Sequence, residues 1–145
     1  MTTAQKPTVL LAEDDPNDLF LVKRAIRQAN LAISLQVVGN GEEAVNYLMR
    51  EGDYADTERY PLPALILTNL KMPRMNGVEL LIWVKQQPHL KDIPVVVMSG
   101  CEEPDEVSRV NDLGANSQFV KPLSVDALAE NLKNLTSLLP SLEQE

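Results

Sequence analysis

The stretch Leu62–Gly77, LPALILTNLKMPRMNG, decides the fold. It opens with an apolar run that stops abruptly at Asn69, after which a proline and a glycine turn the chain into an amphipathic segment. Residues Leu65–Leu67 show no alternation of apolar and polar side chains, which is typical of a strand covered on both faces in a parallel sheet. Ligands of such sheets bind at the carboxyl ends of the strands. The pattern therefore places Asn69 at the expected functional site.

Length, charge and cysteine content narrow the class of protein. The 145 residues predict one domain spanning 1–145, and the formal net charge of -8 argues against nucleic-acid binding through a broad basic surface. The single cysteine, Cys101, excludes an internal disulfide. No apolar run approaches the ~20 residues of a membrane span, and residues 1–6 lack the apolar core of a signal peptide. We therefore expect a soluble, cytoplasmic protein that binds neither nucleic acid nor membrane.

Short apolar runs alternate with segments of helical periodicity along the whole chain. The expected strands are 8–12, 33–38, 65–69, 93–98 and 117–120, and the expected helices begin near residues 16, 41, 78, 104 and 124. The polar segment 50–63 is expected to be a surface loop. Five strands alternating with five helices predict a three-layer α/β domain around a five-stranded parallel sheet.

Polar residues follow the expected strands and should meet at one edge of the sheet. They are Glu13, Asp14, Asn69, Ser99 and Lys121. Two carboxylates, an amide oxygen and a backbone carbonyl form an all-oxygen site suited to Mg²⁺. The Ser99 hydroxyl and the Lys121 ammonium could contact an oxyanion. The pocket has the layout for handling a phosphoryl group but lacks a nucleophile, since the carboxamide of Asn69 is a very poor one.

Each of these residues also has a purely structural interpretation. Acidic residues such as Glu13 and Asp14 are favoured at the start of a helix by its dipole. Ser99 could simply cap the helix that follows it, and Lys121 could be a solvated surface lysine. Only the joint occurrence of these residues at strand ends favours the functional interpretation.

Four motifs in this order and spacing resemble the receiver domain of two-component response regulators. They are VLLAEDDPND (9–18), LILTNLKMPRMNG (65–77), PVVVMSG (94–100) and GANSQFVKP (114–122). The insert REGDYADTERYP (50–61) and the wording LKMPRMNG are similar to single-domain receivers that partner bacterial phytochrome histidine kinases. The resemblance implies a flavodoxin-like, doubly wound (βα)5 fold in which a kinase phosphohistidine donates to an aspartate at the end of the third strand.

On this resemblance, Glu13 and Asp14 correspond to the acidic pair that binds magnesium, with Asp14 the more direct ligand. The carbonyl of Lys71 would complete the protein ligands of the metal, and Asn69 occupies the phosphoacceptor position. Because Asn69 replaces the family's aspartate, the resemblance implies loss of acyl-phosphate chemistry and weaker Mg²⁺ binding. Two origins of Asn69 stay open, a natural pseudo-receiver or an engineered aspartate-to-asparagine variant.

The phosphate side of the implied pocket is formed by Ser99, in the position of the switch serine or threonine, and by Lys121, in the position of the phosphate-binding lysine. The resemblance also implies a cis peptide bond between Lys121 and Pro122. Gln118 stands where the family has an aromatic residue that swings inward on activation. This second departure implies a weakened conformational relay.

Two other classes of protein fit this sequence less well. A haloacid-dehalogenase-like phosphatase requires an aspartate nucleophile and a second aspartate two residues later, and this chain has Asn69 and Lys71. A flavodoxin-like cofactor binder requires a phosphate-cradling loop after the first strand, and the segment EDDPND (13–18) would repel phosphate. We therefore expect no enzyme but a signalling module that docks on a sensor histidine kinase.

The last expected helix carries more leucines than one contact with the sheet requires. They are Leu128, Leu132, Leu135, Leu138, Leu139 and Leu142. The excess predicts a homodimer through the fourth and fifth helix–strand region together with the C-terminal extension. The alternative is that 138–142 folds back on the same subunit, and the acidic end 139–145 is expected to fray.

Overall fold

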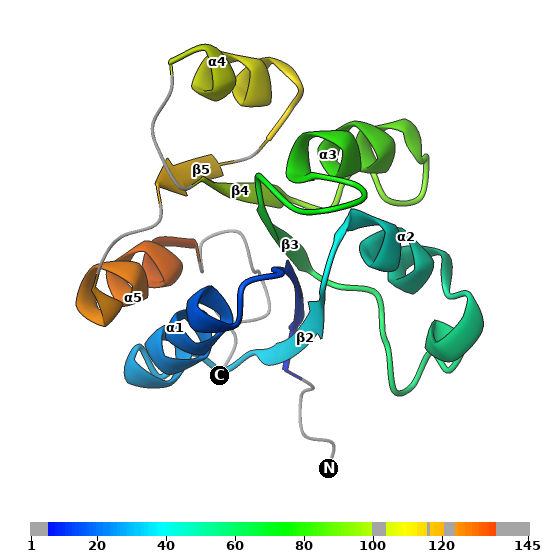
Figure 1. Cartoon of the computed structure of the whole chain (residues 1–145). Helices are drawn as coiled ribbons and strands as arrows, with labels where there is room; N and C mark the ends of the chain where they lie inside the picture. The colour runs from blue at the N-terminus through cyan, green and yellow to red at the C-terminus, as the bar shows by residue number, and fades with distance from the viewer. Residues whose placement is uncertain (1–5, 100–103, 116, 121–123, 136–145) are drawn as a thin grey trace.

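A five-stranded parallel sheet lies between two layers of helices (Figure 1). The computed structural model describes residues 6–99, 104–115, 117–120 and 124–135, and the description below is confined to them. The elements are β1 Thr8–Ala12, α1 Pro16–Gln28, β2 Ser34–Val38, α2 Gly41–Met49, the 3-10 helix η1 Gly52–Tyr54, β3 Leu65–Asn69, α3 Gly77–Gln86, β4 Val95–Ser99, α4 Pro104–Asp112, β5 Ser117–Val120 and α5 Val125–Asn134. The strand order is β2-β1-β3-β4-β5. The predicted doubly wound α/β fold is confirmed.

The strand β3 is central, as its apolar run predicts. All five of its residues are buried. Ile66 faces a core built with α2, α3 and α4, whereas Leu65 and Leu67 face a second core built with α1 and α5. Adjacent side chains of a strand point to opposite faces, so an unbroken apolar run fills both cores. Leu67 and Ile66 are 1% and 0% exposed, which confirms that both faces of the sheet are covered.

Polar caps start the helices where the sequence predicts them. The Asp15 carboxylate accepts a hydrogen bond from the backbone N–H of Asn17 at 2.8 Å, and a proline occupies the first turn of α1. A capping box between Asn76 and Glu79 opens α3. The Ser124 hydroxyl accepts from the N–H of Ala127 and opens α5. These caps fix the helix starts beside the carboxyl ends of the strands.

The segment 50–63 is a surface loop, as predicted, and most of its residues are exposed. It contains η1, and the rings of Tyr54 and Tyr60 pack against Tyr47 of α2 with centroids 5.2 and 5.8 Å away, and against each other at 5.0 Å. The Tyr47 hydroxyl donates to the carbonyl of Pro61 at 2.7 Å, and the Tyr54 hydroxyl donates to the carboxylate of Glu43 at 2.8 Å. The sequence did not predict these tyrosine contacts, because no local pattern identifies the helix on which the half-buried Tyr54 and Tyr60 pack.

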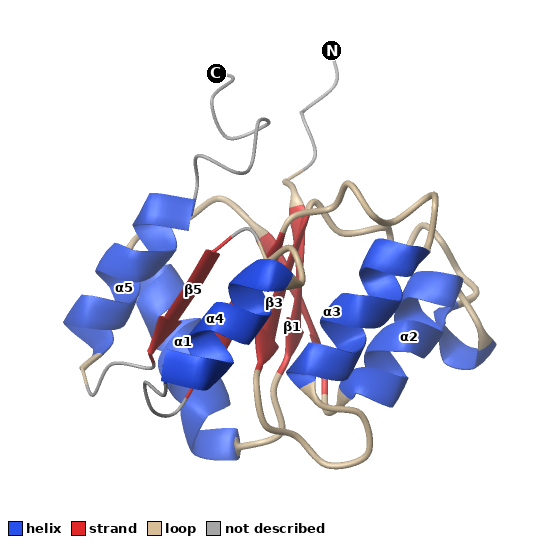
Figure 2. Cartoon of the chain, turned by 90° about the horizontal axis from the view of Figure 1, so that it is seen from above, coloured by secondary structure: helices blue, strands red, loops and turns tan. Residues whose placement is uncertain are grey.

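The topology brings the ends of β1 and β3 together at the centre of the sheet. The two strands pair with Ala12 opposite Thr68, so the residue after each lies at the same edge. Figure 2 shows the strand arrows pointing toward one edge, where the βα loops gather. Within the described residues, no helix is long and apolar enough to cross a membrane.

Candidate functional site

Three of the predicted site residues converge at the carboxyl edge of β1 and β3. Glu13 is 3% exposed and Asn69 is 8% exposed, which makes them two of the few buried polar side chains among the described residues. The backbone N–H of Glu13 donates to the carbonyl of Val38 at 3.0 Å and so holds the start of the loop against β2. Asp14, by contrast, is exposed at the mouth of the pocket.

The side-chain amide of Asn69 lies at the point where the oxygens of this pocket meet. Its nitrogen is 2.9 Å from the carbonyl oxygen of Lys71 and donates to it. The same nitrogen is 3.2 Å from Glu13 Oε2 and 3.3 Å from Asp14 Oδ1. An amide has two N–H donors, so three acceptors share them. This orientation follows from the network, because the amide oxygen would meet three other oxygens if the group were turned over.

These contacts test whether the pocket suits a divalent cation. The predicted protein ligands, which are two carboxylates and the Lys71 carbonyl, do converge, and such oxygens are the donors that Mg²⁺ prefers. The chemistry of the donors therefore fits the ion. The Asn69 nitrogen, however, stands among those donors. An ion could be bound there only if the amide rotated and gave up its hydrogen bonds to them.

Local backbone geometry holds Asn69 in place. The N–H of Gly77 donates to the carbonyl of Leu70 at 2.8 Å, which folds the start of α3 against the end of β3. A Cβ atom at Gly77 would lie 2.4 Å from the carbonyl oxygen of Asn69. The buried Thr68 hydroxyl donates to the same carbonyl at 3.0 Å. The Gly77 turn was visible in the sequence, but its close approach to the site was not.

The loop after Asn69 is also tied to α2, which the sequence analysis missed. The N–H of Gly41 donates to the carbonyl of Met75 at 2.9 Å, and a Cβ at Gly41 would lie 2.5 Å from that oxygen. Arg74, which has a positive φ of 67°, pairs with Glu42 at 3.0 Å. The only signal in the sequence is the pair Asn40-Gly41 at the start of α2, which indicates a turn but not its contact with Met75.

The predicted phosphate side of the pocket is described in part. Ser99 ends β4 and is half-buried, one residue beyond the Met98 that pairs with Asn69. Gln118 lies on β5, where its amide donates to the Asn111 side chain of α4 at 2.8 Å. Lys121 and the peptide bond predicted to be cis lie outside the described residues.

The fold and the layout of the polar residues at the strand ends define a class of protein. Residues 9–133 match the family model described as the response regulator receiver domain, and the chain belongs to this family.

Three particular relatives show where in this family the chain lies. Response regulator Rcp1 of Synechocystis sp. is 33% identical over 135 residues, which cover 93% of this chain and 85% of that protein. The solved structure of response regulator RPA3017 in red light signaling of R. palustris has a TM-score of 0.85 and 28% identity, covering 90% of this chain and 91% of that one. The phosphorylated cyanobacterial phytochrome response regulator RcpA has a TM-score of 0.82 and 32% identity, covering 94% and 95%. The chain is thus similar to phytochrome response regulators over most of its length.

Proposed function

We propose that this chain is a receiver module of a two-component phosphorelay that docks on a sensor histidine kinase without accepting a phosphoryl group at position 69. The observation that supports the proposal is the amide of Asn69, whose nitrogen donates to Glu13, Asp14 and Lys71 in the place of a phosphoacceptor carboxylate. A kinase of the bacterial phytochrome class is the proposed partner, because similar solved structures are described as phytochrome or bacteriophytochrome response regulators.

The chemistry of the amide argues against phosphoryl transfer at this position. A negatively charged carboxylate oxygen can attack phosphorus through a lone pair. The nitrogen lone pair of an amide is delocalised into the carbonyl group, so the amide is a very poor nucleophile. The Asn69 nitrogen is moreover turned toward the acidic pair. The phosphatase alternative also requires carboxylates at positions 69 and 71, and the pocket has an amide and a backbone carbonyl there.

The residues that would hold Mg²⁺ are Glu13, Asp14 and the carbonyl of Lys71. When bound, the ion would neutralise charge on a phosphoryl group in the pocket. Asn69 can offer its oxygen to the ion only by rotating, and the site then has one negative charge fewer than with an aspartate. We therefore propose weak binding of Mg²⁺. A relative, response regulator Rcp1, has been solved in a Mn²⁺-bound form, with a TM-score of 0.79 and 31% identity.

A module without acceptor chemistry can still signal by occupancy. While docked on the kinase, it would not accept the phosphoryl group of the phosphohistidine, and it would exclude other receivers that do. Phe20 of α1 supports such docking, because it is 61% exposed and lies on the helix that starts beside the acidic pocket. An aromatic side chain exposed to this degree is a suitable apolar contact for a partner.

Phosphorylation of matched variants tests the proposal. The native chain, Asn69→Asp and Asn69→Ala are incubated with acetyl phosphate and Mg²⁺, and the intact mass is measured. We expect only Asn69→Asp to gain one phosphoryl group. A gain in the native chain would place an acceptor elsewhere and overturn the proposal. No gain in Asn69→Asp would show that the rest of the pocket cannot support the transfer and that the loss does not depend on Asn69.

A further inference from the structure

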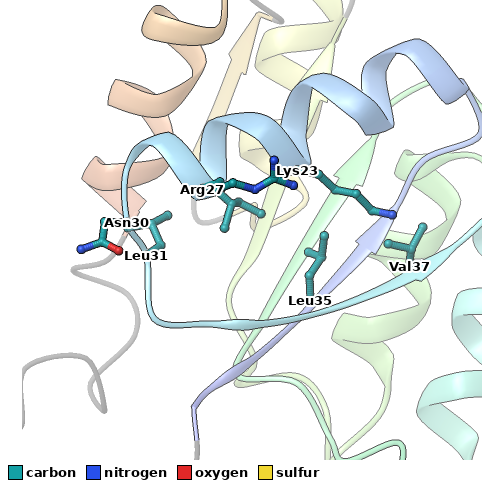
Figure 3. A pocket seen from close by; sticks show the side chains of 7 residues that line it. Lys23, Arg27, Asn30, Leu31, Leu35 and Val37 are labelled. Atoms are coloured by element: carbon teal, nitrogen blue, oxygen red, sulfur yellow. The ribbon is translucent and has the colours of Figure 1, made fainter.

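A groove runs along the edge of the sheet, away from the acidic pocket. It lies between the end of α1 and the edge strand β2 and has a volume of about 440 Å³. Leu35 and Val37 of β2 form its floor, and Leu31 closes one end (Figure 3). All three side chains are only half-buried. An exposed edge strand with an apolar surface favours pairing with other chains unless something covers it.

Two cations lie over this apolar floor. Lys23 and Arg27 stand one helical turn apart on α1, and Figure 3 shows both side chains along the groove. Both are exposed, and within the described ranges neither side chain forms an ion pair or hydrogen bond. Two uncompensated cations beside apolar side chains, in a chain with a net charge of -8, suit a segment that is both apolar and acidic.

The last residues that the structure describes lie next to this groove. A smaller hollow between α1 and α5 shares Ile26 and Leu31 with the groove and is lined also by Leu132 and Leu135. Leu135 is 7% exposed and is the last residue that the structure describes. The following residues therefore start at the border of the groove.

The sequence of those following residues complements the groove. Residues 136–145, TSLLPSLEQE, contain three leucines and two glutamates and no cation. Ten extended residues reach about 33 Å, whereas the two cations of the groove, Lys23 and Arg27, lie only about 6 Å apart along the helix axis. The segment is therefore long enough to cover both the floor and the cations.

We propose that residues 136–145 bind back onto the groove of the same molecule, with leucines over Leu35 and Val37 and the glutamates beside Lys23 and Arg27. The segment would thereby cover the edge of β2. The alternative occupant is the same segment of a second copy of the chain. The tethered segment is favoured, because a short link gives it an effective concentration far above that of a second molecule.

A nitroxide on the segment tests this proposal in the full chain. Gln144→Cys in a Cys101→Ser background carries the label and keeps both glutamates. In ¹⁵N-labelled protein we expect the amide signals of Leu31, Leu35 and Val37 to lose most of their intensity, and to recover it when the nitroxide is reduced. The control sample mixes two kinds of chain, one with the nitroxide but without ¹⁵N and one with ¹⁵N but without the nitroxide. In this sample the amide signals should keep their intensity, because a segment that binds its own molecule brings no nitroxide near the ¹⁵N chains.

Each outcome decides the proposal. Loss in the mixed sample would assign the segment to a second copy, and no loss in either sample would show that it does not bind the groove, so both results overturn the proposal. Arg27→Glu should restore the signals, whereas Arg24→Glu, on the same helix but outside the groove, should not. Equal effects of the two reversals would overturn the pairing of the glutamates with the groove. Preserved dispersion of the amide spectrum confirms that each variant is folded.

Discussion

At the scale of the residue, the site depends on one nitrogen atom. The Asn69 amide places a partial positive charge between Glu13 and Asp14, which keeps two carboxylates close together at the end of β1 and β3. In a receiver with an aspartate at this position, a third negative charge would stand in the same place. The identity of residue 69 thus determines both the chemistry of the pocket and its electrostatic balance.

The variant Asn69→Asp should therefore be less stable than the native chain without Mg²⁺. Glu13 Oε2, in a buried side chain, loses a donor and gains a repelling charge, and removal of a buried hydrogen-bond partner costs about 1–3 kcal/mol. Urea denaturation with and without MgCl₂ measures the free energy of unfolding. We expect Mg²⁺ to restore the stability of Asn69→Asp and to change that of the native chain little. An equal gain for both proteins would contradict the balancing role of the amide.

Gly77→Ala should be destabilising for a steric reason. Its Cβ would lie 2.4 Å from the Asn69 carbonyl oxygen, so the start of α3 must move away from β3. Overpacking of this kind costs typically about 1–3 kcal/mol. Gly39→Ala is the control, because its Cβ would lie 3.4 Å from a flexible glutamate side chain. Denaturant midpoints compare the two variants, and similar midpoints would rule out the close approach.

At the scale of the element, most boundaries were predictable and the contacts between elements were not. The apolar run of β3 and the helix starts near residues 16 and 124 were predicted from local patterns, and the structure confirms them. The packing of Tyr54 on Tyr47 joins two segments through side chains, and no local pattern reports it. The orientation of the Asn69 amide likewise depends on Glu13, which is 56 residues away in the sequence, so no local pattern predicts it.

The tyrosine cluster of α2 and η1 gives the molecule an alkaline sensitivity. Burial, followed by the nearby Tyr60, raises the pKa of Tyr47 from 10.0 to about 12. Between these pH values the Tyr47 side chain of the unfolded chain releases a proton that the folded chain retains, which favours unfolding. The full stability is therefore present below pH 10 and is lost progressively as pH rises toward 12. We expect the free energy of unfolding to fall over this range, as urea denaturation at several pH values would show.

Tyr47→Phe separates this titration from the general effect of alkali. The variant loses the 2.7 Å hydrogen bond to the Pro61 carbonyl, which costs about 0.5–1.5 kcal/mol at neutral pH. It should also show a shallower loss of stability between pH 10 and 12 than the native chain. If the free energy of unfolding fell as steeply with pH in Tyr47→Phe as in the native chain, the titration of Tyr47 would not be the cause of the alkaline loss of stability.

At the scale of the whole molecule, the two faces of the sheet support different sites. The face with α2 and α3 supports the loop after Asn69 through contacts such as Gly41 to Met75. The face with α1 and α5 carries the exposed Phe20 and the groove at β2. Phe20 lies one helical turn before Lys23, the first α1 residue of the groove, so the proposed kinase contact and the proposed covering of the edge strand adjoin each other on α1.

This arrangement predicts that the native chain is a competitor in phosphotransfer. Added to a phosphorylated phytochrome histidine kinase, it should slow transfer to Asn69→Asp without itself gaining a phosphoryl group, because both dock through the same surface. Phe20→Ser should lose this inhibition while its stability stays within about 0.5 kcal/mol, since the side chain is 61% exposed. The control is Met49→Ser on α2, where a side chain 42% exposed lies on the opposite face of the sheet. Time courses of phosphoryl transfer measure the inhibition, and equal inhibition by native chain and Phe20→Ser would remove α1 from the docking surface.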